Sequence, residues 1–407
     1  MGFEFLFQAD KLAVFMACVS GAVGILIFIY SAGYMRQYDH KLEFFFFMSL
    51  FMAAMMGLIF SANILLMYVF WEITAFCSWR LIGFYRKESD LWFADKSFLV
   101  TFFGASVMMA GLALIYLQYG TFNMALLKGT EAGNAIFILL MFGIFSKSAQ
   151  LPLSSWLPDA GVAPSPVTAL LHAAVLVKIG VYAYARFFSD IFVVSDEARL
   201  WFMGIVMFSG LVAAMSALMD NNIKRILAYS TISQLAYIFL GFMVNTGMAI
   251  GGALLYILVH SFGKAGLFLT AGIVEQGTHT KDLRQLGGLI KVAPLAAFAF
   301  LLSAFSIIGI PPFGGFFSKF YVILGTAESG YRFLAALGII TAFMTLLYLM
   351  RLFNGIFLGE EKTPLKPGTP FAMTSVVLVC GVVSLAIGLF IKYPVAWVKS
   401  VAFLMGR

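Results

Sequence analysis

The stretch Phe145-Ser-Lys-Ser-Ala-Gln-Leu-Pro-Leu153 sets a lysine at the end of an apolar run and a proline five residues after it. A charged amine inside a lipid-facing segment is unfavourable, so an intramembrane lysine such as Lys147 marks a functional site by default. Pro152 removes a backbone hydrogen bond and breaks the helix, which exposes polar backbone in the membrane interior. A charge beside a helix break predicts a path for ions.

The composition around this stretch is that of a membrane protein. The 407 residues are 62% hydrophobic and 11% charged, whereas soluble domains average roughly 25% charged residues. An apolar run of about 17–25 residues is long enough to cross a bilayer as a helix. The sequence therefore predicts an all-α polytopic membrane protein with a single transmembrane domain over residues 1–407. Twelve runs read as spans, near 10–33, 43–60, 62–80, 97–118, 134–151, 165–187, 199–219, 228–246, 249–274, 293–326, 330–352 and 371–391.

The basic residues of the loops indicate the orientation. When the loops are numbered alternately, one side is richer in lysine and arginine, and the positive-inside rule makes that side cytoplasmic. Both termini are then predicted to lie outside. The cytoplasmic set includes Lys224 and Arg225, which are predicted to anchor a turn at the membrane interface. Four lysines fall inside spans instead: Lys147, Lys178, Lys264 and Lys319.

A second stretch, Ile310-Pro-Pro-Phe-Gly-Gly-Phe-Phe-Ser-Lys319, again joins a Ser-Lys pair to a helix breaker. The two breaks lie five helices apart, and an odd offset inverts the second unit in the membrane. This pattern predicts two inverted five-helix repeats, 43–187 and 199–352, each containing a broken helix, and a final helix at 371–391. Matching broken helices are the sequence sign of a transporter fold whose sites lie near the membrane midplane.

Lys147 and Glu72 are the first pair of candidate site residues. Burial disfavours the charged form of a lysine and lets it exchange protons near neutral pH. The ordinary alternative is a lysine that reaches the headgroups from a helix end. Glu72, in Tyr68-Val-Phe-Trp-Glu-Ile-Thr74, is predicted to be the one carboxylate within a span. It either forms a structural ion pair or acts as a switchable partner of Lys147.

Histidines and lysines on two further spans predict a relay. His172 and Lys178 share one predicted helix but lie about 120° apart around its axis, so they serve successive positions rather than one face. Tyr256, His260 and Lys264 come at positions i, i+4 and i+8, which places them on one face. A histidine titrates near neutral pH and suits a relay, although a lone helical histidine is more often structural.

Two glycines flank the last of these lysines. Gly263 and Gly266 lie one residue before and two residues after Lys264, and we expect them to allow local unwinding of this helix.

Several classes of site are not expected. Cys18, Cys77 and Cys380 stand singly in apolar runs, so no iron–sulfur or structural zinc site is predicted. No glycine-rich phosphate loop follows a strand pattern, so no nucleotide site is predicted. A metal site is disfavoured because the intramembrane lysines would repel a cation. Sodium binding by backbone carbonyls at the breaks stays open.

Several long motifs resemble one family of membrane proteins. These are Lys147-Ser-Ala-Gln-Leu-Pro-Leu-Ser-Ser-Trp-Leu-Pro-Asp159, Ala163-Pro-Ser-Pro-Val-Thr-Ala-Leu-Leu-His-Ala-Ala174, Asn222-Ile-Lys-Arg-Ile-Leu-Ala-Tyr-Ser-Thr-Ile-Ser-Gln234 and His260-Ser-Phe-Gly-Lys264. They resemble the antiporter-like subunits of respiratory complex I, of Mrp sodium/proton antiporters and of membrane-bound hydrogenases. The stretch Val177-Lys-Ile-Gly-Val-Tyr182 looks closest to the Mrp and hydrogenase branch. The family usually has fourteen core helices, and this chain looks as if it begins at the third.

The resemblance implies roles for individual residues. Glu72 looks like the key glutamate of the first half-channel, and Lys147 looks like its paired lysine on the broken helix. Lys319 resembles the terminal residue on the second broken helix. The connecting residues are implied to be His172 and Lys178 in the first half and His260 and Lys264 in the second. With Tyr256, these make up the candidate proton-translocating set.

The expected function is proton translocation, with exchange for sodium left open, by a subunit of a larger redox-driven complex. The chain is expected to carry no redox centre and no cofactor, so its standing as part of an oxidoreductase depends on other subunits. The expected partners are other membrane subunits of a complex I-like, hydrogenase-like or Mrp-like assembly in a prokaryotic plasma membrane. The alternatives are a subunit of a non-redox Mrp-type antiporter and a structural membrane subunit without transport.

Overall fold

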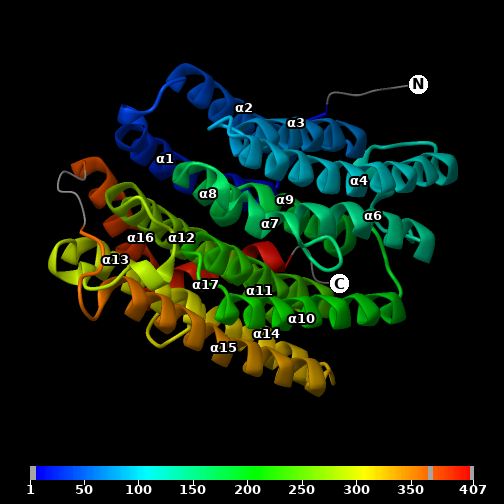
Figure 1. Ribbon diagram of the computed structural model, residues 1–407. Helices are drawn as coiled ribbons and strands as arrows, with labels where there is room; N and C mark the ends of the chain where they lie inside the picture. Colours follow the sequence, from blue (N-terminus) through cyan, green and yellow to red (C-terminus); the bar gives the residue numbers. More distant parts are fainter. Residues whose placement is uncertain (1–5, 365–369, 404–407) are drawn as a thin grey trace.

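The computed structural model describes residues 6–364 and 370–403, and this part of the chain is a bundle of helices (Figure 1). In chain order the helices are α1 (Lys11–Tyr34), α2 (Lys41–Phe60), α3 (Ile64–Ile82), α4 (Glu88–Tyr119), α5 (Met124–Leu127), α6 (Asn134–Lys147), α7 (Trp156–Asp159), α8 (Ser165–Ala169), α9 (Leu176–Tyr184), α10 (Asp196–Met219), α11 (Ile223–Val244), α12 (Gly247–Thr278), α13 (Pro294–Ile308), α14 (Gly314–Glu328), α15 (Arg332–Phe357), α16 (Phe371–Leu389) and α17 (Lys392–Ala402).

The long apolar helices confirm a multi-pass membrane protein. Within the described residues, 10 helical segments are long and apolar enough to cross a membrane, and two shorter apolar helices, α6 and α13, accompany them. One of the 10 is the segment Ser165–Ile191, in which α8, α9 and two π-helical turns follow one another. Each of the twelve predicted runs coincides with one of these helices, and the interrupted run 293–326 corresponds to α13 and α14.

The most buried helices lie at the centre of the bundle. Figure 1 shows α2, α3 and α4 on one flank, α14 and α15 on the opposite flank, and α8, α9, α11 and α12 between them. In an apolar 18-residue stretch of α12, and in one of the segment Ser165–Ile191, 100% of the residues are buried. In the corresponding stretch of α11, 94% are buried. α1 and α16 both pack against α12. Polar side chains on these central helices are therefore kept away from lipid.

Both predicted helix breaks are present. α6 ends at Lys147, and the chain is not helical again until Trp156 begins α7. α13 ends at Ile308, and α14 starts at Gly314. Each break contains a cis peptide bond before a proline. Lys147 closes the helix before its break, whereas Lys319 lies in the helix after its break. The repeat bounds 43–187 and 199–352 stay a prediction.

The two glycines beside Lys264 do not unwind their helix, contrary to the prediction. α12 continues as an unbroken α-helix past both. A Cβ atom on Gly263 would lie 2.9 Å from Ile307 Cδ1, and one on Gly266 would lie 2.1 Å from Ser303 Oγ. The glycines instead let α13 approach α12 closely, which is the usual role of small residues between membrane helices.

Replacing Gly315 with alanine is expected to destabilise the second break. A Cβ atom there would lie 1.8 Å from the backbone oxygen of Ser306, so α13 and α14 would have to separate. Forcing extra atoms into a packed interior typically destabilises by about 1–3 kcal/mol. The measurement is thermal unfolding of the purified protein in detergent. Gly204→Ala in α10 is the matched control, because nothing lies within 4 Å of its added methyl group. Equal melting temperatures for the two variants would contradict this prediction.

Candidate functional site

Lys147 is fully buried at the end of α6. Its Nζ donates a hydrogen bond to the backbone oxygen of Trp71 in α3, at 3.1 Å. The same nitrogen lies 5.4 Å from the centre of the Trp71 ring. A carbonyl oxygen and an aromatic face are the groups that replace water around a buried ammonium ion. The first break therefore holds its lysine against α3 without a carboxylate in direct contact.

Glu72 follows Trp71 in α3 and is half-buried. Its charge and that of Lys147 act on each other, but the two side chains, both in the described part of the chain, form no direct ion pair. Glu72 Oε1 is buried and has no hydrogen-bond partner among the described residues. The predicted pair is thus a pair of neighbours, with one carboxylate oxygen available for a further contact.

Lys178 and His172 do not lie on one regular α-helix, so the predicted angle of about 120° between them does not apply. Residues Leu170–Ala174 form a π-helical turn, and α9 begins at Leu176. Lys178 Nζ donates hydrogen bonds to the backbone oxygen of Ala173 and to Ser261 Oγ of α12. A π-helical turn inside a helix is frequent at functional sites. Here it directly precedes the helix from which Lys178 contacts α12.

His260 is fully buried and lies near several other buried ionisable groups. The charges of Lys178, Lys264, His172 and Lys319 all act on it. Both ring nitrogens of His260 and of His172 are buried without a hydrogen-bond partner among the described residues. The structure therefore brings together residues that the sequence places on separate helices, and leaves their imidazole nitrogens open to bind or release a proton.

Lys319 binds the broken end of α13. Its Nζ donates to the backbone oxygens of Ile307 and Ile308, at 2.8 and 3.2 Å. It also lies 4.9 Å from the centre of the Tyr237 ring and 5.6 Å from that of Tyr256. The last carbonyls of a helix lack partners within the helix and carry partial negative charge, so a lysine there is favourable. The second break thus stabilises a cation with backbone groups that the break itself frees.

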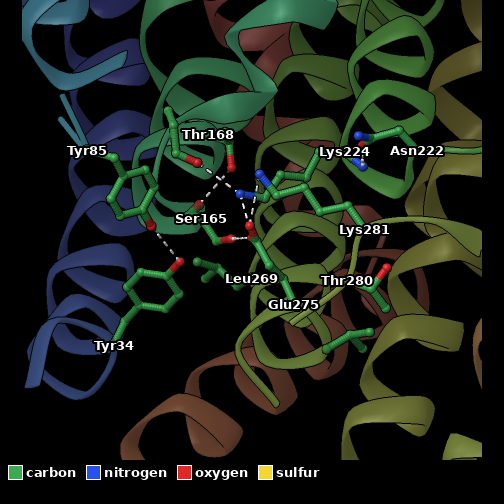
Figure 2. A network of polar contacts seen from close by, with 12 residues as sticks. Tyr34, Tyr85, Ser165, Thr168, Asn222, Lys224, Leu269, Glu275, Thr280 and Lys281 are labelled. Atoms are coloured by element: carbon green, nitrogen blue, oxygen red, sulfur yellow. Dashed lines mark hydrogen bonds and ion pairs between the residues drawn. The ribbon is translucent and has the colours of Figure 1, made fainter. Parts of the chain in front are cut away.

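A buried ion pair was missed by the sequence analysis (Figure 2). Lys224 Nζ lies 2.6 Å from Glu275 Oε2, and Lys281 Nζ lies 3.0 Å from the other oxygen. Ser165 Oγ also donates to Glu275, at 2.9 Å. The predicted role as an anchor at the membrane interface is wrong for Lys224, whose side chain is 1% exposed and pairs with Glu275 inside the bundle. Glu275 lies in the last turn of α12, one residue beyond the predicted span 249–274, so that Glu72 is the one carboxylate within a span stays a prediction.

The signal for this pair was weak because Glu275 lies close to the end of α12, where a carboxylate looks like a loop residue. Lys224 stands two residues after the Asn222 cap of α11 and looks like a loop residue too. Only the packing of α12 against α8 and α11 shows that both are enclosed.

A second polar cluster lies where α1 begins. The Arg186 guanidinium pairs with Asp10 and with Asp190, and Asp190 also pairs with Lys128 at 2.8 Å. Although burial raises the pKa of Asp10, the hydrogen bonds and charge of Arg186 hold it below its ordinary value. The charges in this cluster satisfy one another, so it ties α1 to the end of the segment that contains α9.

The candidate residues can bind and release protons. Lysine, histidine and glutamate each gain or lose a proton, and tyrosine and serine hydroxyls can pass one on. Within residues 6–364 and 370–403, no three His, Cys, Asp or Glu side chains gather in a way that could hold a metal ion. The described site thus offers buried groups that are chemically able to exchange protons.

The sequence matches two family patterns. Residues 61–345 match the family described as "NADH:quinone oxidoreductase/Mrp antiporter, TM". Residues 1–46 match "NADH-Ubiquinone oxidoreductase (complex I), chain 5 N-terminus".

Individual relatives include both antiporter subunits and NADH-quinone oxidoreductase subunits. The chain is 35% identical to a Na+/H+ antiporter subunit of Alkalihalophilus pseudofirmus over 395 residues, which are 89% of this chain and 49% of that protein. It is 34% identical to an NADH-quinone oxidoreductase subunit of Buchnera aphidicola over 413 residues, covering 98% of this chain and 66% of that protein. The chain thus spans about half the length of the antiporter subunits it matches.

A solved structure has the same fold. The structure of the Mrp complex from Dietzia sp. DQ12-45-1b contains a chain that superposes with a TM-score of 0.90 at 25% identity, covering 98% of this chain and 84% of that one. The family pattern extends over more than half of the sequence, and the relatives agree with it. The chain therefore belongs to the NADH:quinone oxidoreductase/Mrp antiporter family of membrane subunits.

Proposed function

We propose that this chain translocates protons across the membrane as one subunit of a multisubunit assembly. The observation that carries the proposal is the series of buried ionisable side chains that runs from the first helix break to the second. It begins at Lys147, which is fully buried, and ends at Lys319, which is 4% exposed. Unused charges inside a membrane protein are unfavourable, so their number here supports a transport role over a structural one.

In the proposed mechanism, the charge of Glu72 controls the proton affinity of Lys147. A carboxylate nearby favours the ammonium form, and its neutralisation or withdrawal favours release of the proton. The separation seen between Glu72 and Lys147 is compatible with a switch, because a small movement of either side chain changes their interaction strongly.

The proton then passes through the central group to the second break. Lys178 and His172 receive it, His260 and Lys264 carry it across α12, and Lys319 is the last carrier. His260 is suited to the middle of this path because the charges of both neighbouring lysines act on it. Waters would bridge the intervals between carriers.

We propose a redox-driven complex, related to complex I or to membrane-bound hydrogenases, as the assembly. A second candidate is a non-redox Mrp-type antiporter that exchanges protons for sodium. It is favoured by the likeness to the Na+/H+ antiporter subunit of Alkalihalophilus pseudofirmus and to the Dietzia Mrp complex. In either case we place the chain in a prokaryotic plasma membrane, with its first and last residues outside, because the opposite loops carry more lysine and arginine.

One experiment tests the function and separates the two assemblies. The complex is purified after mild solubilisation, its subunits are identified, and it is reconstituted into vesicles that contain a pH-sensitive dye. We expect proton movement that stops when the driving reaction or the sodium gradient is removed. Co-purifying iron–sulfur subunits and a redox requirement support the first assembly. Small Mrp-type membrane subunits and a sodium requirement support the second. No proton movement under either condition would refute the proposed function.

A further inference from the structure

Buried side-chain hydrogen bonds lead from Lys264 toward Lys319. Lys264 Nζ donates to Ser230 Oγ of α11 at 2.5 Å. The Tyr348 hydroxyl of α15 donates to the same Oγ at 3.0 Å. Gln234 Nε2, one turn after Ser230, donates to the Tyr348 hydroxyl oxygen at 3.0 Å. Three helices thus contribute to one chain of contacts.

The chain continues on the other side of Gln234. The Tyr256 hydroxyl donates to Gln234 Oε1 at 2.5 Å. It also lies 3.4 Å from the backbone oxygen of Ile307, which is the oxygen that binds Lys319 Nζ at 2.8 Å. Gln234 is therefore the link between a hydroxyl on the Lys264 side and a hydroxyl on the Lys319 side. We name the set Ser230, Tyr348, Gln234 and Tyr256 the amide bridge.

The chemistry of Gln234 differs from that of its neighbours. A hydroxyl group can accept a proton on its oxygen while it gives up its own proton. A side-chain amide offers two N–H donors and a carbonyl acceptor, and has no group that titrates near neutral pH. Nε2 also donates to Thr345 Oγ1 at 3.1 Å and, more weakly, to Ser233 Oγ at 3.5 Å, so the donors and the acceptor of this amide face fixed sides. The amide bridge is continuous in hydrogen bonds but not in groups that relay protons.

The amide bridge is also enclosed. Gln234, Tyr256, Tyr348 and Ser230 are each 0% exposed. A proton that moves between Lys264 and Lys319 by this route must pass the position of Gln234.

We propose that Gln234 is the gate for the transfer step between Lys264 and Lys319. While its amide joins Tyr348 to Tyr256, the step is closed. When the amide turns away and hydroxyls or water connect the two tyrosines directly, the step opens. The inference rests on the proposed function and adds to it a positioning residue that holds no proton itself.

A purely structural role is the alternative. Buried polar networks of this kind also lock helices in place, here α11, α12 and α15. The two roles differ in one respect. A gate becomes a conductor when the amide is replaced by a group that carries a proton, whereas a structural link only loosens.

The decisive variant is Gln234→Glu in the complete complex, reconstituted in vesicles. A neutral glutamic acid accepts a proton on one oxygen and releases another from its second oxygen, so one proton passes and the residue is restored. We measure the passive proton flux down an imposed pH gradient with no driving reaction. We expect it to rise at least about tenfold, since a well-placed proton-transfer group contributes about 10²–10⁴-fold. If Gln234→Glu does not assemble, Gln234→His replaces it, with the same expectation.

Two further variants act as controls. Gln234→Leu keeps the size but removes all the hydrogen bonds of the side chain, and we expect lower driven transport with a wild-type passive flux. Thr341→Val removes a buried hydroxyl in α15 whose one hydrogen bond among the described residues is to the Leu337 backbone oxygen of its own helix, at 2.8 Å, and we expect no change. The proposed gate is wrong if the passive proton flux of Gln234→Glu equals that of the wild type. It is also wrong if the passive flux rises equally in Gln234→Leu, or if Gln234→Leu keeps wild-type driven transport. If the wild-type complex itself moves no protons, the proposed function fails instead.

Discussion

Replacing Lys147 with alanine is expected to abolish driven proton transport while the complex still assembles. The alanine side chain cannot bind a proton. Nζ contacts the Trp71 backbone oxygen and the Trp71 ring but no carboxylate directly, so we expect the fold to tolerate its loss. We expect the transport rate to fall at least about tenfold, equivalent to about 1.4 kcal/mol or more in activation free energy. Proton transport in vesicles measures the loss of activity. Co-purification of the partner subunits measures whether the complex assembles.

Two control variants sharpen this test. Lys147→Arg keeps a positive charge, but a guanidinium group does not release its proton in proteins. It should therefore fail like the alanine variant if Lys147 carries protons. Lys291→Ala changes an exposed lysine and should transport at the wild-type rate. Wild-type transport by Lys147→Ala, or full recovery by Lys147→Arg, would show that no proton passes through this residue.

Breaking the buried pair between Lys224 and Glu275 is expected to have the largest effect on stability. In Glu275→Gln the Lys224 ammonium stays enclosed, at 1% exposure, without its anionic partner. Removing one partner of a buried ion pair typically destabilises by about 3–5 kcal/mol. Thermal unfolding in detergent and the yield of assembled complex are the measurements.

The other partner of Glu275 offers a matched comparison. The Lys281 side chain is 30% exposed, so water screens its interaction with Glu275 and Lys281→Ala should destabilise by less than about 1 kcal/mol. The double variant Lys224→Met with Glu275→Leu removes both charges and should recover much of the lost stability. If Glu275→Gln melts at the wild-type temperature, the pair contributes nothing to the fold.

The charged residues of the path could be predicted because a charge inside an apolar run is rare. Lys147, Lys178, Lys264 and Lys319 stand out for this reason alone, and all are buried as expected. The two breaks could be predicted as well, since proline cannot continue a helix. The local sequence is therefore sufficient to predict the four buried lysines and the two helix breaks.

The uncharged members could not be found in this way, except Tyr256, which was predicted from its helical spacing to His260 and Lys264. Serine, glutamine and tyrosine are ordinary in membrane spans, and nothing local distinguishes Gln234 from a residue that fills space. Its importance depends on Tyr256 and Tyr348, which lie on other helices and reach it only after packing. The prediction that Gly263 and Gly266 allow local unwinding was wrong for the same reason. Their role depends on the packing of α13 against α12, which the local sequence of α12 does not show.

In the proposed proton path, the unbroken course of α12 would make one transfer step sensitive to membrane voltage. Lys264 and Tyr256 are eight residues apart on this helix, which separates them by about 12 Å along its axis. That is about two fifths of a hydrocarbon core about 30 Å thick. A unit charge that crosses the whole core exchanges about 2.3 kcal/mol per 100 mV with the field. A proton that moved between these two levels would therefore exchange at most about 0.9 kcal/mol per 100 mV, the value for a helix that stands along the membrane normal, and the voltage would favour one direction of the proposed step.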